Sequence, residues 1–174
     1  MASVSHLLVR PATPADAPAV AATYNEGIAD RVATFETRER EAEDVRAWLA
    51  DARRPFLVAT VDGQVVGFAR VAPYSTRAVY DGVGEHGVYV ARAARGRGVG
   101  RRLLEELCAA AEAAGLHKLT GRIFADNATS IAAHEAAGFR VVGVQRRHAR
   151  LDGAWKDCVL VERLLGDAAA EPSP

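Results

Sequence analysis

A short stretch rich in glycine and arginine is the part of this chain best suited to binding phosphate groups. Arg95, Gly96, Arg97, Gly98 and Gly100 follow directly after an apolar, β-branched segment. Alternating glycines let a ligand come close to the backbone. The residues that follow have a helical pattern, and the start of a helix presents free N–H groups and the positive end of its dipole. The segment therefore predicts a strand, a turn and a helix that together hold a pyrophosphate.

The spacing of this loop distinguishes it from two other phosphate-binding loops. A P-loop carries Lys and then Ser or Thr after its last glycine, whereas Arg101 and Arg102 follow Gly100 here. A dinucleotide-binding loop reads G-x-G-x-x-G, whereas these glycines lie at every second position. Taken alone, the loop leaves two other interpretations open: a flexible basic turn, and an arginine–glycine segment that grips nucleic acid.

The composition of the chain argues against nucleic acid as the partner. The 174 residues include 22 Lys and Arg against 22 Asp and Glu, whereas a nucleic-acid-binding domain carries an excess of basic residues. A basic loop in a neutral protein suits a small phosphorylated ligand. The two cysteines have no metal-ligand spacing, so we expect no metal site and no disulfide framework. No apolar run reaches membrane-spanning length and no signal peptide is visible, so we expect a cytoplasmic protein without a membrane partner.

Hydrophobic periodicity predicts a single domain over residues 1–165 and a disordered tail over residues 166–174. The order of the elements predicts a mixed, largely antiparallel sheet with helices on both faces, at the border of the α/β and α+β classes. Asp62 and Gly63 form a strong turn signal between two of the strands. The expected strands cover residues 7–10, 55–59, 65–71, 85–90, 118–124, 141–150 and 154–164, and the expected helices cover residues 14–29, 41–52, 99–114 and 126–137.

A second segment makes the interpretation more specific. Asn127 opens a predicted helix, His134 lies seven residues later, and Gly138 and Phe139 close it. The glycine loop before it reads Arg-x-x-Gly-x-Gly. In this order the two motifs resemble those of the GCN5-related N-acetyltransferases, whose loop reads Arg/Gln-x-x-Gly-x-Gly/Ala. The resemblance covers residues 7–164 and implies the fold of that family, the GNAT fold.

His134 also indicates a branch of that family, because most members have a tyrosine at this position. The chain resembles the phosphinothricin and arsinothricin acetyltransferases and their methionine-sulfone-acetylating relatives, also in Tyr24-Asn25, the 77–81 loop and Glu85. This resemblance implies a homodimeric resistance enzyme. It would move the acetyl group of acetyl-CoA to the α-amine of a small amino-acid-like acceptor, such as phosphinothricin, arsinothricin, methionine sulfone or methionine sulfoximine.

The resemblance also implies where acetyl-CoA binds. Val88, Tyr89 and Val90 are expected to pair with the pantetheine arm as an extra strand, and a backbone N–H near Val90 to polarise the thioester carbonyl. Asn127 is expected to contact CoA through its amide while also capping its helix. The pyrophosphate is expected on Arg95, Gly96, Arg97, Gly98, Val99 and Gly100.

Acetyl transfer to an amine requires a group that takes a proton from the ammonium. Glu85 is the first candidate because it lies on the strand expected to carry the thioester. His134 is the second, because helical spacing places it on the same face as Asn127 and Ile131, toward the expected cleft. Its role stays open between proton relay and acceptor binding. The other histidines, His6, His86, His117 and His148, are expected at the surface.

Two long connections, residues 31–40 and 72–83, are expected to line the acceptor pocket. Since a guanidinium pairs bidentately with carboxylate or phosphinate, Arg77 is the first candidate to bind the acceptor's anion and Arg70 the second. The aromatic walls are expected from Phe35, Tyr74 and Tyr80. Two alternatives remain: a ribosomal-protein or peptide N-terminal acetyltransferase, which needs a more open groove, and a non-catalytic acyl-CoA-binding module, which would lack the two candidate catalytic residues.

Overall fold

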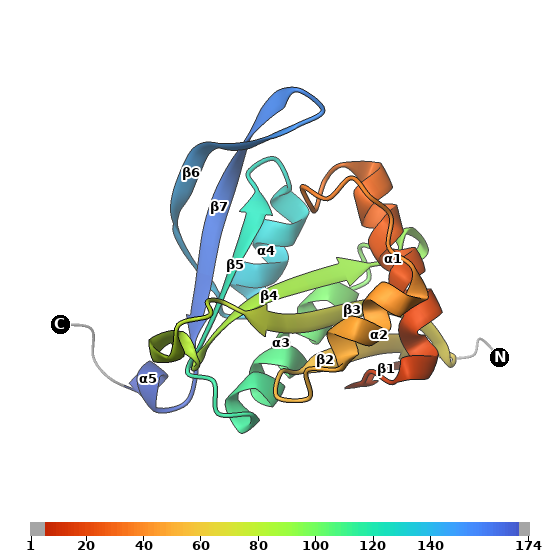
Figure 1. Cartoon of the computed structure of the whole chain (residues 1–174), viewed down its shortest axis with the longest axis horizontal. Coiled ribbons are helices and arrows are strands. Elements are labelled where there is room, and N and C mark those ends of the chain that lie inside the picture. Colours follow the sequence, from red (N-terminus) through yellow and green to blue (C-terminus); the bar gives the residue numbers. More distant parts are fainter. Residues whose placement is uncertain (1–5, 171–174) are drawn as a thin grey trace.

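A computed structural model describes the protein over residues 6–170 and shows a seven-stranded sheet with helices on both faces (Figure 1). The strand order is β1-β2-β3-β4-β5-β7-β6. The strands are β1 (Leu7–Pro11), β2 (Phe56–Val61), β3 (Gln64–Pro73), β4 (Val83–Val90), β5 (Lys118–Phe124), β6 (Arg140–Leu151) and β7 (Ala154–Leu164).

Neighbouring strands are antiparallel everywhere except between β4 and β5, which run parallel. A parallel pair needs a long crossover, and α3 (Val99–Ala113) supplies it. The predicted mixed, largely antiparallel sheet is therefore confirmed. The parallel pair lies in the middle of the sheet. Its first strand, β4, leads into the glycine loop, and the candidate site lies at this pair.

Two apolar layers cover the two faces of the sheet. Phe68 of β3 packs with Tyr24 and Val45 in one layer, whereas the next residue, Ala69, belongs to the other layer with Leu104. Successive residues of a strand point to opposite faces, which explains this division. The first layer is closed by α1 (Ala17–Asp30) and α2 (Ala42–Leu49), and the second by α3 and α4 (Ala128–Ala136).

Glycines in left-handed conformation end several elements where the sequence predicted. Asp62 and Gly63 have φ angles of 49° and 81° and join β2 to β3 in a tight hairpin turn. Gly115 and Gly138 have φ angles of 85° and 84° just after α3 and α4, where a residue with a Cβ would be strained. Three short 3₁₀ helices lie in the connections between these elements: η1 (Pro14–Asp16), η2 (Ala78–Tyr80) and η3 (Arg92–Ala94).

The end of the chain departs from the prediction of a disordered tail. α5 (Asp167–Ala170) forms one helical turn, and Leu165 before it is buried in the core, which holds the start of this segment. The prediction is therefore wrong for residues 166–170, and residues 171–174 lie outside the described part. Within residues 6–170, none of the helices is both long and apolar enough to cross a membrane.

Candidate active site

The main cleft opens where β4 and β5 separate. β4 pairs with β3 from Gly84 to Val90, but with β5 only from Val83 to Glu85. Figure 1 shows the two strands diverging beyond this point. On the side facing β5, the backbone groups of β4 after Glu85 therefore have no strand partner within the described chain. A cleft of about 1210 Å³ lies there, and an extended ligand can pair with these groups as an added strand.

The side chains of this open segment of β4 are occupied by the two cores. Val88 and Val90 pack against the layer of α3. The ring of Tyr89 packs on the other face, with its centroid 4.7 Å from that of Tyr24 and 5.1 Å from that of Phe68. The backbone of residues 88–90, which line the cleft, is therefore the part of β4 best placed to meet a ligand.

The glycine loop and the start of α3 form one wall of this cleft. Gly96 and Gly98 have φ angles of 73° and 79°, and a Cβ on either would meet no atom within 4 Å, so backbone conformation explains these glycines. A Cβ on Gly100 would meet only Val90, at an ordinary 3.6 Å. Packing within the protein therefore does not require glycine at position 100, whereas a ligand lying against this helix start would.

The arginines of the loop are held mainly by one acidic side chain. Arg92 and Arg95 both pair with Asp30 of α1, each at 2.7 Å, and their hydrogen bonds hold the pKa of that carboxyl below its usual range. Arg95 also donates from Nε to the Val90 carbonyl at 3.0 Å. Arg95 therefore shapes the loop and lines the cleft. Arg97 is exposed and lies outside the lining of the cleft.

Asn127 ties α4 to the connection between α1 and α2. Its Oδ1 accepts from the backbone N–H of Ser130 at 3.1 Å, which is the predicted N-cap. Its Nδ2 donates to the Val32 carbonyl at 3.0 Å. In this arrangement the amide forms part of the cleft wall and joins segments that lie 95 residues apart in the sequence.

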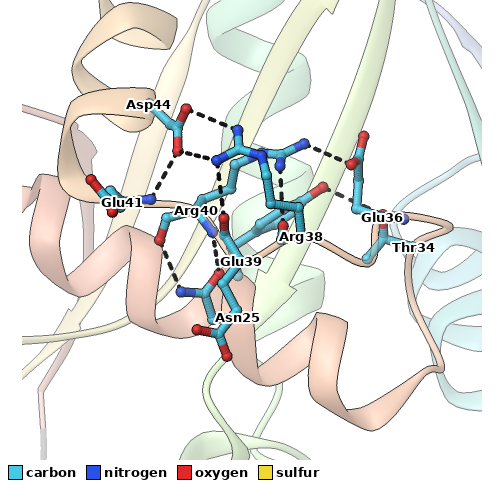
Figure 2. A network of polar contacts seen from close by, with 9 residues as sticks. Asn25, Thr34, Glu36, Arg38, Glu39, Arg40, Glu41 and Asp44 are labelled. Carbon is cyan, nitrogen blue, oxygen red and sulfur yellow. Dashed lines mark hydrogen bonds and ion pairs between the residues drawn. The ribbon is translucent and has the colours of Figure 1, made fainter.

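The connection between α1 and α2 is held over the cleft by the polar network in Figure 2. Oδ1 of Asn25 accepts from the backbone N–H of Arg40 at 2.8 Å, and its Nδ2 donates to the Arg40 carbonyl at 2.9 Å. Arg40 also pairs with Glu36 at 2.7 Å. Phe35 lines the cleft and packs edge-on against Phe124 of β5, with ring centroids 4.7 Å apart. The connection therefore spans the gap between the two diverging strands.

Glu85 lies at the point of divergence and forms an ion pair there. It is the last residue of β4 that pairs with β5, opposite Thr120. Its Oε1 is 3.2 Å from Nη1 of Arg122, which lies two residues further along β5. The two side chains are 36% and 44% exposed, so a ligand can reach both.

A second, smaller cavity of about 250 Å³ meets the main cleft at this ion pair. Glu85 and Arg122 line both cavities. Tyr74 and Tyr80 form a wall of the smaller one, with ring centroids 5.5 Å apart and nearly perpendicular rings. The structure thus brings these tyrosines together with Glu85, on the opposite side of the ion pair from the glycine loop.

The two arginines named as anion-binding candidates line neither cavity. The guanidinium carbon of Arg70 lies 4.4 Å from the ring centroid of Trp48, and burial lowers the pKa of Arg70. The guanidinium carbon of Arg77 lies 5.7 Å from the ring centroid of Tyr80, on an exposed loop. Each arginine is thus placed on an aromatic ring, an arrangement that favours a cation over the face of the ring.

His86 is buried, so the expectation that it lies at the surface is wrong. It is 8% exposed, and its Nε2 lies 2.9 Å from Nε2 of His134, which is 3% exposed. Strand alternation explains the position, because His86 is in phase with the inward-facing Val88. A Cβ at Gly121 would lie 2.6 Å from the His86 ring, so that glycine leaves the space that the ring fills.

The hydrogen-bond partners decide which nitrogens of this pair carry hydrogen. The Ser130 carbonyl can only accept, so Nδ1 of His134 donates to it at 2.7 Å. Neutral His134 then accepts at Nε2 from Nε2–H of His86. Burial lowers the pKa of His86 to about 3, with a further contribution from His134, and burial also lowers the pKa of His134. Both rings are therefore neutral at pH 7, and neither nitrogen of His134 is left for a substrate.

Two residues of the site, His86 and Arg122, were not identified from the sequence. A sequence pattern could have identified the first but not the second. His86 carried a signal, because its place in an alternating strand predicts an inward side chain. Arg122 carried none, because its closeness to Glu85 depends on the register of the parallel pair β4–β5. Such pairing joins strands distant in sequence, and no local pattern specifies it.

The chain is similar to known acetyltransferases over most of its length. The model of the acetyltransferase (GNAT) family matches residues 21–139. The L-methionine sulfoximine/L-methionine sulfone acetyltransferase of Pseudomonas paraeruginosa is 32% identical over 168 residues, which cover 94% of this chain and 98% of that protein.

The fold is also similar to that of two solved structures. A GNAT superfamily phosphinothricin acetyltransferase from Sinorhizobium meliloti, in complex with AcCoA, superposes with a TM-score of 0.88 at 28% identity, covering 97% of this chain and 93% of that one. A ribosomal-protein-alanine N-acetyltransferase from Brucella melitensis superposes with a TM-score of 0.86 at 37% identity, covering 91% and 99%. The predicted fold is confirmed.

Proposed function

Because the chain belongs to the acetyltransferase (GNAT) family and is an acetyl-CoA-dependent acyltransferase, we propose that its acceptor is the α-amine of a small amino acid. The side chain of that acceptor would carry a tetrahedral, oxygen-rich group. L-Methionine sulfoximine, L-methionine sulfone, phosphinothricin and arsinothricin have this chemistry. The observation that carries the proposal is the meeting of two cavities at Glu85, a long one suited to CoA and a small one suited to an amino acid. The activities named for the relatives agree with it.

In this proposal the cofactor occupies the main cleft. Its pyrophosphate lies on the backbone of residues 96–100, where the start of α3 favours negative charge. Its pantetheine arm pairs with the open backbone of residues 88–90 as an added strand. Asn127 offers its amide at the wall of the cleft. The thioester then reaches the point where β4 and β5 separate, next to Glu85.

We assign the proton-accepting role to Glu85. The acceptor's ammonium gives a proton to this carboxylate, directly or through water, and the free amine nitrogen attacks the thioester carbonyl carbon. The backbone N–H near Val90 donates to the oxygen that becomes negative. The C–S bond then breaks, the CoA thiolate leaves, and it takes up the second proton that the nitrogen loses, which yields the amide and free CoA. His134 has a positioning role, because both its ring nitrogens are engaged within the protein.

A panel of acceptors in a thiol-release assay tests this function. With acetyl-CoA, we expect turnover of methionine sulfone, methionine sulfoximine and phosphinothricin. We expect no turnover of polyamines or aminoglycosides, which lack the α-amino acid group. Turnover confined to those amines would contradict the acceptor class and leave the acetyltransferase activity intact.

A second candidate function is N-terminal acetylation of a ribosomal protein, and the likeness to the Brucella melitensis structure favours it. A peptide acceptor needs an open groove, whereas the second cavity measures only about 250 Å³. Peptides that begin with alanine belong in the same assay. Preference for such peptides over free amino acids by kcat/KM would support this candidate and contradict the first.

We also propose that two copies of the chain form a homodimer and that the enzyme detoxifies amino-acid analogues in the cytoplasm, where acetyl-CoA is supplied. The outer arm made by β6 and β7 carries exposed apolar side chains, which favour association. Sedimentation at assay concentration tests the dimer, and a monomer there would contradict it. The exposed apolar side chains are Val141, Val142, Val144, Trp155 and Leu164.

A further inference from the structure

We propose that Arg122 binds the α-carboxylate of the acceptor and so selects free amino acids over other amines. The inference rests on the proposed function and names the residue that sets its specificity. It starts from the ion pair of Arg122 with Glu85, 3.2 Å between Nη1 and Oε1, at the junction of the two cavities.

The charges of this ion pair are the complement of an α-amino acid. Such an acceptor carries an ammonium and a carboxylate on the same carbon atom. A carboxylate and a guanidinium held side by side can bind the two groups together, the ammonium on Glu85 and the carboxylate on Arg122. A guanidinium presents several N–H donors in a fixed plane, so Arg122 can hold a second carboxylate without leaving the first. An amine without the carboxylate satisfies only half of this arrangement.

Among the described residues, the small cavity has one other positive side chain, and it is less exposed than Arg122. Lys118 lines this cavity and forms an ion pair with Glu162, which also pairs with Arg140. Lys118 is 31% exposed, whereas Arg122 is 44% exposed and pairs within residues 6–170 with Glu85 alone. Because the planar guanidinium of Arg122 has five N–H donors and is the more exposed, it is the better placed of the two cations to bind a second carboxylate.

The position of Arg122 follows from the strand register. Glu85 lies opposite Thr120 in the last parallel pair before the strands separate. Arg122 is two residues further along β5, so its side chain leaves the sheet on the same face as those of Thr120 and Glu85. Separation of the strands leaves this face open beside the guanidinium. The carboxylate of an acceptor bound there lies next to Arg122, while its amine faces Glu85 and the thioester.

The experiment compares L-methionine sulfone with its carboxamide in wild type and in Arg122→Ala, using acetyl-CoA as donor. In the wild type we expect the acid to be preferred in kcat/KM. In Arg122→Ala, kcat/KM for the acid is expected to fall about 10- to 100-fold, the loss typical of a charge-assisted hydrogen-bonded pair. For the carboxamide we expect a change below about threefold, since its carbonyl group makes no ion pair to lose. Arg122→Lys should restore part of the preference, because it keeps the charge and loses the planar fork.

The carboxamide separates recognition from an indirect effect through Glu85. If Arg122 acted only on the neighbouring carboxylate, the variant would lose activity equally with both substrates, and that result would overturn the inference. An unchanged ratio of acid to carboxamide would overturn it too. Arg46→Ala, on the exposed face of α2, is the control and should match wild type. A wild type that acetylates neither compound but acetylates peptide N-termini would overturn the proposed function itself, and the inference with it.

Discussion

Two neighbouring residues of β4, Glu85 and His86, belong to opposite faces of the sheet and to opposite kinds of environment. Glu85 pairs with Arg122 as ions that are each more than a third exposed. His86 pairs with His134 as neutral rings that are at least nine-tenths buried. Both pairs link β4 to an element beyond the cleft, the first to β5 and the second to α4.

The difference shows which pair can carry protons. A proton acceptor must offer a lone pair that a substrate can reach, and the exposed carboxyl group of Glu85 does so. The histidines line the cleft, but the Ser130 carbonyl and the ring of His86 already bond to both nitrogens of His134. Its role is to hold α4 against the sheet, and thereby to hold the wall of the cleft. His134, a candidate base by sequence, has a positioning role in our proposal.

The largest expected effect is that of removing the charge from the exposed pair. Glu85→Gln is expected to lower kcat by about 10²- to 10⁴-fold while the KM for acetyl-CoA stays the same. The loss should shrink at high pH, where the acceptor amine is already neutral. Steady-state kinetics across pH measure both effects, and full activity of this variant would show that the two pairs do not differ in this way.

A smaller effect is expected from a bulky side chain in the glycine loop, the wall of the main cleft where the cofactor is proposed to bind. Neither the ion pair nor the histidine pair lies in this loop. Gly100→Leu should raise the KM for acetyl-CoA by about 10- to 100-fold, because the added side chain occupies the helix start where the pyrophosphate is proposed to lie. Stability should change little, since a Cβ there meets only Val90 at 3.6 Å. The control is Gly143→Ala on β6, where a Cβ meets no atom within 4 Å. An unchanged KM would move the cofactor away from this loop.

The buried pair is expected to reveal itself in stability rather than in catalysis. The folded protein holds the pKa of His86 at about 3 against an ordinary 6.5, so the unfolded chain binds a proton first as the pH falls. The free energy of unfolding should therefore be constant above pH 6.5 with respect to this group, and fall below it by up to about 1.4 kcal/mol per pH unit. Denaturant titrations between pH 6.5 and 4.5 measure the slope.

Two variants show whether His86 causes this dependence of the unfolding free energy on pH. His86→Leu should reduce it, because it removes one of the two titrating rings. His117→Gln, at an exposed position, should leave it as in wild type. An equal slope in wild type and His86→Leu would mean that the pair is not neutral and buried in solution.

The smallest effect is expected at the loop arginine that the sequence favoured. Arg77 lies on the ring of Tyr80 and outside both cavities, so Arg77→Ala should raise the acceptor KM by less than about threefold. The KM for acetyl-CoA should not change. A rise of tenfold or more, larger than that of Arg122→Ala, would place the acceptor's anion on Arg77 and would reverse the assignment made for the exposed pair.

Much of the chain could be predicted locally, because each such feature depends on neighbours in the sequence. The turn at Asp62 and Gly63 requires left-handed backbone, which these residue types tolerate. The strand, glycine turn and helix around Gly98 form one continuous segment, so local pattern was enough to predict these elements. Asn127 caps α4 as expected, because an N-cap bonds to a residue three positions away.

What only the tertiary structure decided are the contacts between strands and helices distant in the sequence. The parallel register of β4 and β5 brings Arg122 to Glu85, and the packing of α4 on the sheet brings His134 to His86. Residue type showed that each of these side chains could ionise. Whether it does depends on burial and on the partner it meets, and both are properties of the assembled fold. The sequence alone therefore identified an acetyltransferase, and the structure separated the exposed carboxyl group of Glu85 from the buried histidines.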